Sequence, residues 1–178
     1  MLTTPKESPV NAPLHALTAP VFVRQLSAHA EILDKAAVHT QTAGLDQAVL
    51  MNDRLYPDMF PFWLQVHSAC DHAANATARL TETPLPVFDE TPQTFDGLKA
   101  RIAATLAFVG SPDAARYNGA ETRTFTLPIN GRERTLNGTD YLLIWALPNF
   151  YFHLTTAYGI LRKNGVPVGK RDFIGTLD

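Results

Sequence analysis

The stretch YLLIWALPNFYFHLTTAYGIL, residues Tyr141–Leu161, contains no charged side chain, although it includes a proline and several polar residues. Its length would allow a membrane span, since roughly 20 apolar residues cross the hydrocarbon core of a bilayer. Asn149, His153 and Thr156 oppose that interpretation, because polar groups in hydrocarbon cost free energy. A helix buried inside a helical bundle explains the same run. We therefore expect a core helix and no membrane association.

Pro148 interrupts this predicted helix, because proline has no backbone N–H to donate to the carbonyl of Ile144. Apolar residues continue on both sides, so we expect Pro148 to lie inside the helix with a kink around it. Asn149 and His153 are one turn apart on the inner face, and we expect both to be buried and hydrogen-bonded. They are either an ordinary polar pair of the core or the lining of a small polar pocket.

The opposite side of the same helix is also apolar, unlike the solvated back of an ordinary bundle helix. Its members are Ile144, Leu147, Tyr151 and Tyr158. Such a surface left bare is an association site. The hairpin and the C-terminal segment described below could cover it, but we favour a second copy related by a twofold axis, that is, a homodimer.

Three earlier segments, approximately 14–43, 58–80 and 91–109, show apolar residues at helical spacing. Asp58 and Thr91 are the expected N-caps of the second and third helices, with Pro92 in the first turn of the third. The first segment has its apolar stripe at Leu14, Leu17, Val21, Ala28, Ile32 and Ala36.

Between the third and last helices the period changes. Asn130-Gly131 predicts a tight hairpin turn joining Thr124–Ile129 to 132–136, and this short hairpin should lie on the helical body. With no strand–helix alternation, the chain predicts an all-α fold: a four-helix bundle with a short β-hairpin before the last helix. Residues 13–178 would form one domain, preceded by a flexible N-terminal tail, 1–12.

The composition of the chain argues against several classes of function. The chain has 178 residues, 46% of them hydrophobic and 18% charged, with a formal net charge of −2. This charge gives no electrostatic case for binding nucleic acid. Cys70 is the single cysteine, so no intramolecular disulfide can form, and the first residues lack the apolar segment of a secretory signal. We expect a cytoplasmic protein.

Histidines at favourable spacing are the natural candidates for a metal site in a bundle. The last helix supplies His153 together with Asn149, whose amide oxygen is a poor ligand for zinc. On the second helix His67 lies about 100° from the centre of the apolar stripe, and His72 and Asp71 point further away. We therefore expect no metal site. Nucleophile-elbow, phosphate-loop and dinucleotide-binding motifs do not occur either.

Two stretches carry a family resemblance: RLYPDMFPFWLQVHSACDHA (54–73) and ALPNFYFHLTTAYGILRKNGVPVGKRDFIG (146–175). Both resemble the uncharacterised bacterial and fungal family DUF1993, which is similar to the DinB/YfiT-like superfamily of four-helix bundles. That superfamily typically binds a divalent metal through three histidines and includes thiol-dependent transferases and isomerases. The resemblance places its second last-helix histidine at His153 and its first at Asn149, where this chain departs from the pattern.

The recurring polar positions of the family correspond to Asp58, Gln65, Asp71, Asn149 and His153, which are the site residues that the resemblance implies. Two functions of different classes follow. The first is a small-molecule-binding module with a polar pocket at the last helix. The alternative is a DinB-like enzyme that uses His153 as an acid or base, or as a weak metal ligand. The sequence identifies neither a cofactor nor a substrate.

Overall fold

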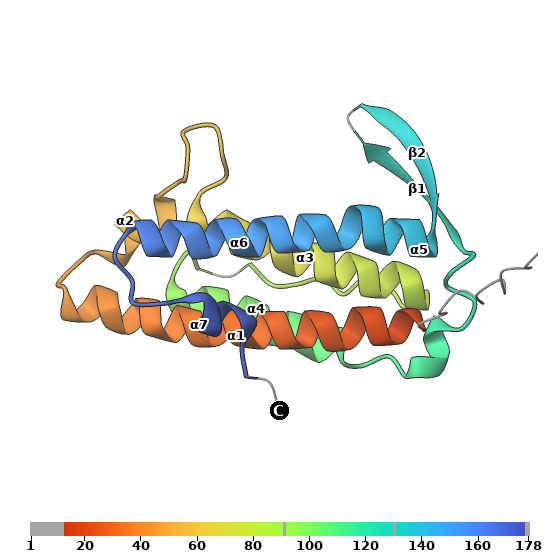
Figure 1. Ribbon diagram of the computed structural model, residues 1–178, viewed down its shortest axis with the longest axis horizontal. Helices are drawn as coiled ribbons and strands as arrows, with labels where there is room; N and C mark the ends of the chain where they lie inside the picture. The colour runs from red at the N-terminus through yellow and green to blue at the C-terminus, as the bar shows by residue number, and fades with distance from the viewer. Residues whose placement is uncertain (1–12, 91, 130, 177–178) are drawn as a thin grey trace, which may run out of the picture.

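The structure is a computed structural model that describes residues 13–90, 92–129 and 131–176. The predicted tail, 1–12, lies outside these residues. Four long helices lie side by side (Figure 1), and neighbouring pairs are α1 with α4, α4 with α3, and α3 with α6. Their bounds are α1 Leu14–Thr42, α3 Phe62–Thr81, α4 Phe95–Val109 and α6 Leu147–Lys163. The predicted four-helix bundle is confirmed.

Shorter elements connect and flank these helices. They are α2 Gln47–Asn52, a 3₁₀ turn Ala114–Tyr117, β1 Thr124–Ile129, β2 Arg132–Asn137, α5 Gly138–Asp140, a π-helical turn Tyr141–Ala146 and α7 Lys170–Ile174. The terminal helix α7 packs against α1. Of the described helices, none is both long enough and apolar enough to cross a membrane.

The core lies between the four helices. The predicted stripe of α1 is largely buried, although Leu17 and Val21 are only half-buried. Phe22, one position later, is fully buried and meets the ring of Phe150 from α6 edge-on, with 4.8 Å between centroids. The inner face of α1 is therefore rotated slightly from the predicted one, because α1 packs against α4 and α6 together.

Two predicted helix starts are wrong. Asp58 is exposed in the loop 53–61, and α3 begins at Phe62, directly after Pro61, whose fixed φ suits a helix entry. Helix α4 begins at Phe95 with Thr94 as its cap, since the Thr94 hydroxyl accepts a bond from the Gly97 N–H at 3.1 Å. Position 91, the predicted cap, lies outside the described residues.

The last helix runs without a break from α5 through the π-helical turn into α6, so Pro148 lies inside it as predicted. The Asn137 side chain caps its start by accepting from the Asp140 N–H at 2.8 Å, and Gly165 ends it with φ +80°. The expected kink takes the form of the π-helical turn, which changes the backbone bonding directly before the proline that cannot donate.

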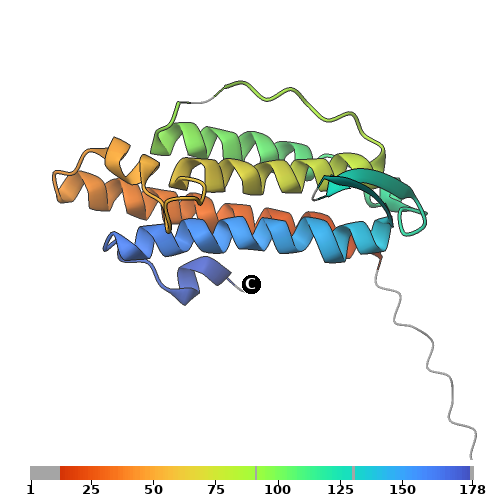
Figure 2. The same ribbon diagram turned by 90° about the horizontal axis from the view of Figure 1, so that it is seen from above.

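The hairpin forms with the predicted strands, and its antiparallel register pairs Thr124 with Asn137 and Ile129 with Arg132. Its position differs from the prediction. It rises from the end of the bundle instead of lying along it (Figures 1 and 2). In β1 Leu127 is buried and the Phe125 ring packs against Tyr141, while every residue of β2 except the half-buried Leu136 is exposed.

Candidate functional site

The candidate site lies where α3 and α6 face each other. His153, midway along α6, is 9% exposed, and its Nδ1 lies 2.7 Å from Oε1 of Gln65 on α3. Gln65 is 1% exposed, and its Nε2 donates to the carbonyl of Phe60 at 3.0 Å. The prediction that His153 is buried and hydrogen-bonded is confirmed, and Gln65 is its partner.

These two bonds determine the protonation of His153. The carbonyl of Phe60 can only accept, so the amide nitrogen of Gln65 points to it and the amide oxygen points to His153. Nδ1 of His153 must therefore carry the proton and donate. Burial lowers the pKa of His153, partly opposed by the carboxylate of Asp71. The imidazole is thus neutral near pH 7, and its Nε2 holds a lone pair that can accept a proton or bind a donor.

Aromatic rings surround this imidazole. The Phe60 ring is nearly parallel to it at 6.1 Å between centroids, and the His72 ring at 5.5 Å. The neighbouring Phe152 ring meets it edge-on at 5.5 Å, and Trp145 lies 6.5 Å from His72. His153 therefore sits in a mainly apolar setting in which hydrogen bonds and charges act more strongly than in water.

The position of His72 corrects the sequence analysis, which placed this residue away from the inner face. His72 comes seven residues after Gln65, which is two helical turns, so both project towards α6. The stripe was misjudged because α3 packs against α4 and α6 at once, which widens its buried arc. Burial, followed by the charges of His153 and Arg79, lowers the pKa of His72 to about 4.

Asn149 is half-buried one turn before His153, and its side-chain amide donates to the Trp145 carbonyl at 2.7 Å. Asn149 is thus hydrogen-bonded as predicted but only half-buried, and its bond goes to the Trp145 carbonyl rather than to the Ile144 carbonyl that Pro148 leaves free. The bond stays within one helix, so Asn149 supports the local backbone beside His153.

Asp71 and Asp58 occupy other positions. Asp71 is exposed on α3 and forms an ion pair with the buried Arg101 of α4, whose guanidinium lies 3.7 Å from the centre of the Phe88 ring. Its effect on His153 is electrostatic and not a contact. Asp58 lies on the exposed loop 53–61. Of the five predicted site residues, the structure brings Gln65 and His153 into contact and places Asn149 one helical turn before His153.

The described side chains around His153 include too few metal ligands for a metal site. His72 and His153 face each other, but within the described ranges no group of three His, Cys, Asp or Glu side chains could hold a metal ion. A protein metal site needs at least three well-placed ligands. The residues present therefore do not fit the three-histidine site of the superfamily. Cys70 offers no thiolate either, because burial raises its pKa to about 11.

The sequence and the fold both resemble those of known proteins. The family model described as Domain of unknown function (DUF1993) matches residues 14–174. A crystal structure of a DinB family member protein from Shewanella denitrificans superimposes with a TM-score of 0.86 and 38% sequence identity, covering 92% of this chain and 93% of that one. No curated protein matches the sequence.

Proposed function

Because this chain belongs to the family DUF1993 and its last helix presents an oriented, neutral histidine, we propose that it is a small-molecule-binding module centred on His153. One observation carries the proposal. The Gln65 amide, itself held by the Phe60 carbonyl, fixes the Nδ1 proton of His153 and leaves the Nε2 lone pair as an oriented acceptor.

The side chains around His153 indicate which class of ligand would bind there. The rings of Phe60, Phe152 and His72 offer apolar, planar contacts, and the lowered pKa values of His72 and His153 keep both imidazoles uncharged near neutral pH. A charged ligand would meet no counter-ion among these side chains. A neutral aromatic compound with one hydroxyl or N–H donor fits, since its ring can stack and its donor can bind Nε2.

Phenol, p-cresol and indole are suitable probes. We expect at least one of them to shift the ¹⁵N resonance of the His153 Nε2 at millimolar concentration in the wild-type protein. His153→Phe should abolish binding, while the matched variant His39→Phe, on α1 and away from the site, should keep it. Thermal unfolding of both variants checks that they are folded. Binding that survives His153→Phe, or no shift with any probe, would refute the proposal.

The enzyme alternative is favoured by one specific observation: a second neutral imidazole, His72, stacks 5.5 Å from His153. An oriented neutral histidine is the usual form of a general base, and here it would accept a proton at Nε2 from a bound ligand. Elemental analysis of the purified protein distinguishes the metal-dependent version. A stoichiometric metal that disappears in His153→Phe would put the enzyme first.

A further inference from the structure

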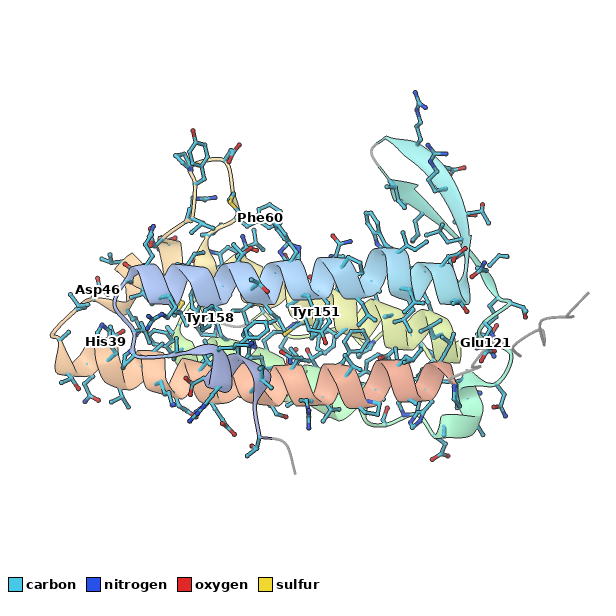
Figure 3. The ribbon with its side chains drawn as sticks, in the orientation of Figure 1. His39, Asp46, Phe60, Glu121, Tyr151 and Tyr158 are labelled. Atoms are coloured by element: carbon cyan, nitrogen blue, oxygen red, sulfur yellow. The ribbon has the colours of Figure 1, made fainter. Side chains whose placement is uncertain are left out.

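The side of α6 that faces away from α1 is apolar and exposed. Ile144 and Phe152 are 64% and 55% exposed, and Pro148 lies exposed between them. These three residues, one turn apart, form what we call the α6 face. The predicted association surface was placed differently. Tyr158 is half-buried against Phe173 of α7, and Figure 3 shows Tyr158 and Tyr151 on the α1 side of α6, opposite Phe60.

Two arms rise beside this face. The loop 53–61 stands above one end of α6 and the hairpin β1–β2 above the other, on the same side of the bundle (Figures 1 and 2). The loop carries three large exposed side chains: Tyr56, 65% exposed, Phe60, 48%, and Leu55, 47%. The α6 face, the loop 53–61 and the hairpin thus form a concave surface, which we call the saddle.

The loop arm is held in shape, although its tip is apolar and exposed. Its ends are joined by the bond from the Phe62 N–H to the Asp53 carbonyl at 2.9 Å, and Arg54 donates to the Met59 carbonyl. Lys163, at the end of α6, donates to the Asp53 carboxylate at 2.9 Å and fixes the base. A rigid loop loses little conformational entropy on binding, which suits a docking element.

The charges of the two arms are opposite. The hairpin arm exposes Arg132 and Arg134 against a single acidic residue, Glu133. The loop arm contains Asp53, Arg54 and Asp58 and so has a formal charge of −1; Asp53 is paired with Lys163 of α6, and Asp58 is exposed. A partner that fits this saddle offers an acidic projection at the hairpin end and a basic projection at the loop end. A second copy of the chain, turned end for end, has this arrangement.

We propose that the α6 face is a homodimer interface in which two copies pack with their α6 helices antiparallel. The twofold axis lies in the interface, perpendicular to α6, so the hairpin of each copy lies beside the loop 53–61 of the other. Arg132 and Arg134 then approach the Asp58 of the second copy. The same contact occurs twice, as a closed twofold interface requires.

The exposed apolar area supplies the larger part of what such a contact needs. Taking about 200 Å² for a large side chain, Ile144 and Phe152 of the face and the three large side chains of the loop leave on the order of 500–600 Å² open. A standard interface buries about 800 Å² on each partner. The exposed hairpin residues supply the remainder when they lie against the second copy.

The second copy would also close the site around His153. Phe60 and Phe152, whose rings lie against His153, are both exposed members of the saddle. A partner that covers them removes water from the imidazole. The interface stands on the exposed surface alone, and only this closing role rests on the proposed function.

Analytical ultracentrifugation at micromolar concentration tests the interface. The wild type should sediment as a dimer, and Phe152→Glu should raise the dissociation constant at least a hundredfold. Val87→Glu is the matched control, because Val87 is fully exposed on the loop between α3 and α4, and this variant should remain a dimer. A monomeric wild type, or a Phe152→Glu variant that stays dimeric, would overturn the proposal.

Charge reversal tests the antiparallel arrangement. Asp58→Arg alone, and Arg132→Glu with Arg134→Glu, should each weaken the homodimer about tenfold, because like charges then face each other. An equimolar mixture of the two variants should recover wild-type affinity, since every introduced charge meets an opposite one. A mixture as weak as its components would overturn this arrangement, as would a hairpin-to-hairpin cross-link between copies.

The ligand experiment separates the two proposals. Phenol should shift the His153 Nε2 resonance at lower concentration in the wild-type dimer than in monomeric Phe152→Tyr/Ile144→Glu, which keeps an aromatic ring beside His153. Equal binding by monomer and dimer refutes the closing role while leaving the proposed function intact. A dimer that binds no probe refutes the proposed function and leaves the interface.

Discussion

Two buried histidines of this bundle differ in what surrounds them. His29 on α1 is 2% exposed, and its Nδ1 and Nε2 lie 3.1 and 3.2 Å from the carbonyls of Gln25 and Leu154. His153 has one nitrogen held by the Gln65 side chain and the Nε2 lone pair oriented among aromatic rings. Both are neutral near pH 7, but His29 is closed by backbone on both sides, whereas His153 is held from one side.

The difference separates a histidine of the core from a candidate functional one. A neutral imidazole has a single N–H, so His29 can donate to only one of its two carbonyls at a time. Such a ring links α1 to α6 and has no free acceptor to offer a ligand. His153 differs, because its Nδ1–H donates to Gln65 and the lone pair on its Nε2 remains available to a ligand. The two positions therefore predict different responses to substitution.

The largest expected effect comes from His29→Ala. This change leaves a cavity in the core and leaves the Leu154 carbonyl without a partner from α1, so we expect a loss of about 3–4 kcal/mol of unfolding free energy at pH 7. Urea denaturation measures it. His39→Ala, half-buried near the end of the same helix, is the control and should change stability by less than about 1 kcal/mol. Equal losses in the two variants would show that His29 is not a core residue.

The pH dependence of stability is the next largest effect. Burial lowers the pKa of His29 from its usual 6.5 to about 4, opposed in part by the two carbonyls. Between these values the unfolded chain binds a proton that the folded protein excludes. His29 therefore stabilises the fold fully above pH 6.5, and this contribution, about 3 kcal/mol, is lost as the pH falls towards 4.

Urea denaturation of the wild type and of His29→Leu across pH 4 to 7 measures that contribution. The variant cannot be protonated at this position, so its stability should fall less steeply on acidification. His72, His67 and His153, whose pKa values are also lowered by burial, maintain a shallower decline in the same direction. Identical slopes for the two proteins would contradict the assignment to His29.

The sequence predicts those features of the fold that depend on neighbouring residues, and it does not predict those that depend on contacts between distant ones. The four helices and the hairpin follow from local periodicity and from the Asn130-Gly131 turn, which need no knowledge of distant contacts. The helix starts at Phe62 and Phe95 were missed because Pro61 and Thr94 compete with the equally suitable candidates Asp58 and Thr91 nearby. Local chemistry permits several caps, and packing selects one.

The site was predicted in part. His153 was found from its place on the inner face of the last helix and Gln65 through the family resemblance, but their direct bond joins residues 88 positions apart and has no local signal. Phe60 was missed because its contact with His153 depends on how the loop 53–61 folds back. His72 was rejected because a single apolar stripe was assumed for a helix that contacts two neighbours. Its spacing of seven from Gln65 was the signal that could have revealed it.

Gln65→Glu sharpens the comparison at the second histidine. A carboxylate beside Nδ1 favours the charged imidazolium, so the pKa of His153 should rise, while that of His29 stays unchanged. NMR titration of the two rings measures both values. Gln65→Leu is the companion variant, and it should remove the preference of His153 for a proton on Nδ1. An unchanged His153 pKa in Gln65→Glu would mean that the Gln65–His153 bond does not exist in solution.

The smallest effect is expected at Asn149, which the family resemblance places in the site and the structure places beside it. Its amide donates to the Trp145 carbonyl of its own helix, and that bond contributes about 0.5–1.5 kcal/mol. Asn149→Ala loses the bond but gains about 0.5 kcal/mol of helix propensity, so unfolding free energy should fall by less than about 1 kcal/mol. The pKa of His153 and the binding of phenol should be unaltered, because Asn149 makes no bond to the imidazole. A large drop in phenol binding, measured by the same Nε2 resonance, would instead place Asn149 in contact with the ligand and extend the site by one helical turn towards Trp145.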